Sequence, residues 1–186
     1  MTLRAEVVAV LRDSPVDRIK FNIGNITISK TEFEKVAKAI EKDDIAVVTG
    51  SSGPKLGASY TSWKTRRIKD GEKKMIGKIT LGKGDVTKTP LGKAAIYHES
   101  THALMDVSNH KIPMIDEEVI AYIADVMYLS ALPYENFTGT KQVMAIFNAA
   151  NALIKSKKLL LKPSTVLKWS DCDELRLAIK AHPAYR

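Results

Sequence analysis

Two histidines with three residues between them constrain this chain more than any other feature of its sequence. They begin and end the pentapeptide His98-Glu99-Ser100-Thr101-His102. Residues four apart lie on one face of an α-helix, so both imidazoles can bind one metal ion if this segment is helical. Glu99 then lies beside them on the wall of the same cleft, close enough to act on a water molecule at the ion. The spacing predicts two metal ligands, His98 and His102, and a general base, Glu99.

The flanking sequence supplies the helix that this spacing requires. Thr89 suits the N-cap, and Pro90 suits the first helical position, where a missing N–H costs nothing. Ile96, Leu104 and Val107 recur on a helix face that points away from the two histidines. We therefore expect a helix that begins after Thr89 and carries the whole pentapeptide.

A third ligand is expected because catalytic zinc usually takes three protein ligands and leaves its fourth position to water. The triplet Asp116-Glu117-Glu118 opens the next apolar helix. Asp116 can cap that helix, and both glutamates lie in its first turn, where the helix dipole favours negative charge. Capping alone also accounts for these residues. The triplet thus offers a candidate ligand without deciding between Glu117 and Glu118.

The segments His98-Glu99-Ser100-Thr101-His102-Ala103 and Glu118-Val119-Ile120-Ala121-Tyr122-Ile123-Ala124 resemble the zincin metallopeptidases. The resemblance is to the branch with a glutamate ligand (gluzincin-like), and most closely to its small minimal-domain members. In such families the third ligand is a glutamate followed three residues later by alanine, which implies Glu118. The resemblance spans roughly residues 75 to 130, and the Asn-Glu-x-x-x-Asp form of the larger thermolysin-like enzymes is absent. It implies Zn²⁺ as the cofactor and a peptide or protein as the substrate.

Other side chains near the motif are weaker candidates. Asp106 follows His102 by one helical turn and can orient an imidazole, although a solvated carboxylate near a helix end is the simpler interpretation. Tyr122 and Asp125 lie on the same predicted helix face as Glu118. Either side chain can reach the site, but a helical tyrosine is more often a core or rim residue.

Peptide hydrolysis also requires a hydrogen-bond donor that stabilises the oxyanion. His110, Tyr134 and Tyr97 are the candidates for this donor. For His110, which follows Asn109, an exposed loop position is the alternative. The sequence does not choose between the three.

A predicted hairpin precedes the active-site helix, with strands over residues 60–68 and 74–81. In zincins the strand at this place is the sheet edge that pairs with an extended substrate. An exposed edge binds a peptide through main-chain hydrogen bonds without reading its side chains. We therefore expect Lys74, Lys78 and Ile79 on the substrate-binding edge, with Lys73, Lys74 and Lys78 favouring acidic peptides.

The order of predicted elements indicates an α+β domain. Strands within residues 18–29 and over 45–49 flank a helix over 31–42, which Thr31 caps together with Glu34. Helices follow over residues 140–155 and from Ser164 to about Lys180. We expect one small zincin-like domain over residues 1–186, with its catalytic core at about 60–132. In it an N-terminal mixed or antiparallel sheet packs on the active-site helix and the glutamate-bearing helix, followed by C-terminal helices.

The composition narrows the classes of protein that remain. Of the 186 residues 45% are hydrophobic and 27% charged, as in an ordinary soluble globular protein. The formal net charge of +8 favours an acidic partner, but the basic run from Lys64 to Lys78 also fits the solvated face of a hairpin. No zinc-finger spacing or aromatic RNA-binding motif is present, so specific nucleic-acid binding is not predicted. The single Cys172 excludes an internal disulfide.

No segment resembles a membrane span or a cleavable signal, which predicts a cytoplasmic protein or one exported without such a signal. The function predicted best is that of a zinc-dependent metallopeptidase. The alternatives are a non-catalytic basic module of zincin fold that binds nucleic acid or an acidic partner, and a peptidase domain that acts as an effector or toxin. The physiological substrate and the oligomeric state cannot be read from the sequence.

Overall fold

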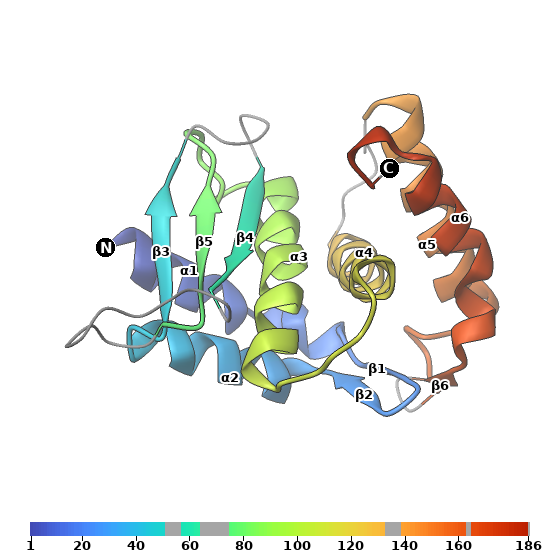
Figure 1. The fold of residues 1–186 in the computed structure, drawn as a ribbon, viewed down its shortest axis with the longest axis horizontal. Coiled ribbons are helices and arrows are strands. Elements are labelled where there is room, and N and C mark those ends of the chain that lie inside the picture. Colours follow the sequence, from blue (N-terminus) through green and yellow to red (C-terminus); the bar gives the residue numbers. More distant parts are fainter. Residues whose placement is uncertain (51–56, 64–74, 133–138, 163–164, 186) are drawn as a thin grey trace.

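The computed structural model describes residues 1–50, 57–63, 75–132, 139–162 and 165–185. These residues form six α-helices and two small mixed sheets, so the α+β class is confirmed (Figure 1). The helices are α1 (Leu3–Leu11), α2 (Lys30–Glu41), α3 (Pro90–Val107), α4 (Met114–Ser130), α5 (Lys141–Ser156) and α6 (Asp173–Ala181). The strands are β1 (Phe21–Ile23), β2 (Ile26–Ile28), β3 (Ile45–Thr49), β4 (Ala58–Ser62), β5 (Gly77–Leu81) and β6 (Val166–Leu167). Short 3₁₀ helices cover Ser14–Arg18, Trp169–Cys172 and Pro183–Tyr185.

The sheet next to α3 has the strand order β3-β5-β4. β3 runs parallel to β5, and β4 runs antiparallel to it. The prediction that the 74–81 strand is the substrate-binding edge is therefore wrong, because β5 is the central strand of this sheet. The side chains of β5 agree with this central position, because a strand between two neighbours exposes little surface. Its buried residues are Gly77, Ile79, Thr80 and Leu81. Among the described strands, β4 is the edge that lies beside α3 (Figure 1).

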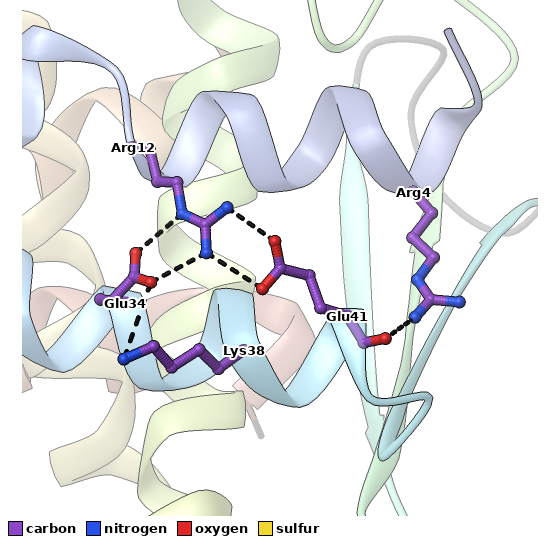
Figure 2. Close-up of polar contacts among 5 residues, drawn as sticks. All are labelled: Arg4, Arg12, Glu34, Lys38 and Glu41. Atoms are coloured by element: carbon purple, nitrogen blue, oxygen red, sulfur yellow. Dashed lines mark hydrogen bonds and ion pairs between the residues drawn. The ribbon is translucent and has the colours of Figure 1, made fainter.

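Helices α1 and α2 lie side by side and are joined by the guanidinium of Arg12 (Figure 2). Arg12 binds Glu34 with two hydrogen bonds of 2.8 Å, and it binds Glu41 at 2.7 and 3.0 Å. Glu34 therefore pairs with Arg12, and α2 begins at Lys30 with Ser29 at its N-cap. The helix predicted over 31–42 is confirmed, but the capping box of Thr31 and Glu34 is not formed, because the helix starts one residue before Thr31.

The hydrophobic core is centred on α3 and α4, which make the most extensive contact between any two elements. Tyr97 of α3 is fully buried between Phe33 and Tyr128, with ring centroids at 5.1 and 4.7 Å. Its hydroxyl donates a hydrogen bond to the main-chain oxygen of Val10. Tyr97 therefore packs one side of α3 against α1 and α2. The two histidines lie on a different side of α3.

The C-terminal segment differs from the single helix predicted over residues 164–180. Val166 and Leu167 form β6, which pairs in parallel with β1, and Trp169 packs against Gly24 in the β1–β2 turn. Gly24 adopts a positive φ of 56°, which suits glycine. These long-range contacts delay the helix, so α6 begins only at Asp173. None of the helices in the described residues is both long and apolar enough to cross a membrane.

Candidate metal centre

Helix α3 presents the pentapeptide as the spacing requires. Its N-cap is Thr89, whose hydroxyl accepts a hydrogen bond from the main-chain N–H of Gly92 at 3.1 Å. Pro90 occupies the first helical position. At Gly92 a Cβ atom would lie 2.1 Å from the main-chain oxygen of Val86, so glycine lets the preceding loop pack closely on the helix. The helix therefore begins where its capping residues predict.

The two imidazoles of α3 converge on one carboxylate of α4. Nε2 of His98 lies 3.3 Å from Oε2 of Glu118, and Nε2 of His102 lies 3.4 Å from Oε1 of the same residue. One potential ligand atom from each residue can be chosen so that all three lie within 4.8 Å of one another. Glu118 is only 8% exposed and His98 only 9%. This convergence selects Glu118 over Glu117 as the carboxylate that faces both histidines.

Each imidazole has a second carboxylate on its far side. Nδ1 of His98 lies 3.7 Å from Oδ2 of Asp125, and Nδ1 of His102 lies 3.2 Å from Oε2 of Glu117. Such contacts orient an imidazole so that its other nitrogen points at a metal. Asp106, which was also expected to orient an imidazole, lines the cleft and accepts a hydrogen bond of 2.9 Å from the hydroxyl of Tyr60 on β4.

Two tyrosines lie against the same group of side chains. The ring of Tyr122 meets that of His98 edge-on, with a centroid distance of 4.7 Å and an angle of 75°. Tyr185, in the last 3₁₀ turn, donates a hydrogen bond of 2.9 Å to Oε2 of Glu118. The two phenol oxygens are 3.1 Å apart. Tyr122 was expected on the Glu118 face, whereas nothing in the sequence near the motif indicates Tyr185, which is 67 residues from Glu118.

The three converging side chains and Tyr185 line an open cleft of about 510 Å³. Its wall combines α3, α4, the edge strand β4 and the last turn of the chain, through Ser59, Tyr60, Ser62, His98, Glu99, His102, Asp106, Met114, Glu117, Glu118 and Tyr185. Glu99 thus shares the cleft with the three converging side chains. A larger pocket of about 660 Å³ lies elsewhere, against the exposed side of α1, and its lining contains no histidine and a single carboxylate, Glu41.

The pKa values in the cleft follow from burial and from the close charges. Burial lowers the pKa of His98, but hydrogen bonds to Asp125 and Glu118 outweigh it and raise that pKa well above the usual value. Burial raises the pKa of Glu118, whereas its contacts with His98, His102 and Tyr185 lower it, and the lowering wins. Burial also raises the pKa of Glu99. The two histidines and a main-chain hydrogen bond from Tyr60 offset part of this increase.

Buried carboxylates without enough positive charge nearby are costly. Glu118 and Asp125 are both almost fully buried, and Oδ1 of Asp125 has no hydrogen-bond partner. A divalent cation between His98, His102 and Glu118 would offset this negative charge. Two imidazole nitrogens and one carboxylate are also the protein ligands of many catalytic zinc sites. The side chains present therefore fit a zinc ion.

The remaining predicted site residues lie apart from the cleft or outside the described residues. Tyr97 is in the core, and His110 follows α3 without lining the cleft. Lys78 and Ile79 are on the central strand β5, and neither lines the cleft. Lys73, Lys74 and Tyr134 are not among the described residues.

The face on which Lys78 lies can be derived from its neighbours. A Cβ atom at Gly77 would contact the Tyr60 hydroxyl, so residue 77 shares the sheet face that Tyr60 turns toward α3. Successive side chains of a strand point to opposite faces, which places Lys78 on the face turned away from α3. The expectation that Lys78 biases the cleft toward acidic peptides is therefore not supported.

Comparisons with family models, with curated proteins and with solved structures found no match to this chain. The function is therefore inferred from the geometry of the cleft and from the sequence motif that builds it.

Proposed function

We propose that this chain is a zinc-dependent metallopeptidase of zincin type, which hydrolyses a peptide bond. The observation that carries the proposal is the convergence of His98, His102 and Glu118 in a cleft that Glu99 also lines. A helix with a purely structural role does not require two imidazoles that face a buried carboxylate. It also does not require a second carboxylate beside them, Glu99, whose charged form is disfavoured by burial. The same combination disfavours a purely basic binding module, because none of the described residues that line the cleft is a lysine or an arginine.

Each side chain of the cleft has a task in this proposal. His98, His102 and Glu118 would hold the ion. A zinc ion at this place would lower the pKa of a water molecule and polarise the scissile carbonyl group. Glu99 takes a proton from the attacking water and later passes it to the leaving amine. Its raised pKa brings it closer to working pH, which suits a group that accepts and then returns a proton.

The edge strand β4 is the proposed site for an extended peptide. Main-chain hydrogen bonds join Trp63 to Ile76 and Gly82 to Gly57, each at 2.8 Å. In the alternating pattern of an antiparallel pair, residues 59 and 61 then bond to β5, and the main-chain groups of residues 58, 60 and 62 point away from β5. The N–H of Tyr60 already hydrogen-bonds Glu99, so a peptide that lies along the cleft would pair with the other outward main-chain groups of β4. The substrate-binding edge is therefore reassigned from β5 to β4.

The substitution E99Q tests the chemistry separately from metal binding. Glutamine has the shape of glutamate but cannot accept the proton, so cleavage of fluorescein-labelled, denatured casein should fall by about 10²- to 10⁴-fold. Zinc content, measured by plasma mass spectrometry, should stay at the wild-type level. E174Q, at an exposed position on α6, is the matched control and should keep both properties. Cleavage by E99Q at the wild-type rate would rule out the mechanism.

A further inference from the structure

Each of the three proposed ligands also contacts a further polar side chain of the protein. Asp125 contacts His98, Glu117 contacts His102, and Tyr185 donates a hydrogen bond to Glu118. The first two partners come from α4, the helix that also carries Glu118. Tyr185 comes from the turn Pro183–Tyr185, which follows α6 near the C-terminus (Figure 1).

The turn that carries Tyr185 is held in place by contacts with α4. Arg176 of α6 binds Asp116, at the start of α4, with a hydrogen bond of 2.7 Å from Nε to Oδ1. Leu175 and Ile179 are fully buried on the inner face of α6. The helix ends at Ala181, and His182 is its C-cap residue. The ring of His182 packs on that of Tyr185, with the two ring centroids 5.6 Å apart. The packing of α6 on α4 therefore places the Tyr185 phenol in the cleft.

Two further contacts fix the phenol itself. Its oxygen lies 2.9 Å from Oε2 of Glu118 and 3.1 Å from the hydroxyl of Tyr122. Oε2 is also the Glu118 oxygen that lies 3.3 Å from Nε2 of His98. The phenol thus contacts the ligand carboxylate at the place where it faces the ion.

We propose that Tyr185 is a positioning residue that holds Glu118 in the orientation in which it binds the metal. The assignment rests on the proposed function. A glutamate side chain has three rotatable bonds, and fixing them on binding a metal costs rotamer entropy. A hydrogen bond from a half-buried phenol fixes them in advance, and losing it leaves a buried carboxylate oxygen short of a partner. The C-terminal turn is thereby an integral part of the metal centre.

The test is the dissociation constant for Zn²⁺ itself, measured by competition with a chromophoric chelator. Y185F removes only the hydroxyl and should raise this constant by about 10- to 100-fold, the usual effect of losing such a partner. Y122F is the matched control: it removes the neighbouring hydroxyl but keeps the bond from Tyr185 to Glu118, so it should change the constant far less. In the E118A background, Y185F should have no further effect, because the side-chain oxygen that it positions is gone.

The melting temperature of each metal-free variant separates positioning from a loss of fold. We expect each metal-free variant to keep one cooperative melting transition, and added zinc to raise the melting temperature of Y185F less than that of Y122F. Equal zinc affinity of Y185F and the wild type would overturn the assignment and leave the proposed function intact. Unchanged affinity with a loss of casein cleavage would overturn it as well, and would assign the phenol to the substrate. A wild-type chain that binds no zinc would overturn both proposals.

Discussion

Among single residues, His98 has the most unusual environment in the cleft. Its two ring nitrogens face Glu118 and Asp125, and all three side chains are nearly inaccessible to solvent. In the metal-free protein these carboxylates favour a protonated imidazole, which is why the pKa of His98 lies well above the usual value in spite of burial. A metal ion and a proton therefore compete for the same nitrogen.

This competition predicts a pH-dependent zinc affinity. The raised pKa of His98 adds stability to the metal-free fold. That stability is fully present below the unfolded-state pKa of about 6.5 and is lost as the pH rises through the higher folded-state value. Zinc has to displace the proton, so its dissociation constant should fall as the pH rises through that range and then level off. Chelator competition at a series of pH values measures this. An affinity that does not change with pH would contradict the assigned protonation of His98.

The residues of the site differ in how far the sequence alone can predict them. His98, Glu99 and His102 follow from one helical spacing, and Thr89 with Pro90 places the start of that helix. The sequence leaves Glu117 and Glu118 undecided, because both fit the first turn of α4. Only the packing of α3 on α4 separates them, by turning Glu118 toward both Nε2 atoms and Glu117 toward Nδ1 of His102. Tyr185 could not be predicted, since its contact depends on the docking of a distant helix.

At the scale of elements, the helices and most strands are local and could be predicted, whereas the order of the strands could not. Residues 45–49 and 77–81 have the apolar character of strands, and both form them. Which strand lies at the edge depends on the parallel pairing of β3 with β5, a crossover that no local pattern encodes. The assignment of the substrate edge to Lys78 and Ile79 failed for this reason.

If a substrate pairs with β4, methylation of its amide nitrogens should affect binding at every second residue. We expect that, in the casein peptide identified as the cleaved sequence, N-methylation of single amides near the scissile bond raises KM at alternate positions. The reason is that β4 turns main-chain groups toward the cleft only at every second residue. Kinetics on a series of synthetic peptides, each methylated once, measures this, with the unmethylated peptide as the control. An equal effect at every position would speak against strand pairing.

At the scale of the whole molecule, the proposed metal centre lies where the two halves of the fold meet. Helix α3 packs on the β3-β5-β4 sheet and on α2, while α4 packs on α5 and α6 (Figure 1). The ligands come from both helices of this central pair, and Tyr185 adds the last turn of the described chain. A bound ion therefore links elements from both halves, and binding that is specific to the folded state stabilises the fold.

The most direct test of the metal centre is the zinc content of the protein, purified without chelators and measured by plasma mass spectrometry. We predict about one zinc ion per chain for the wild type, as expected for three converging protein ligands. H102A should lose it, because one of two imidazole ligands is gone, whereas H110A, which alters the histidine that follows α3 outside the cleft lining, should retain it. A wild-type chain that contains no zinc, and takes up none when zinc is added, would contradict the account.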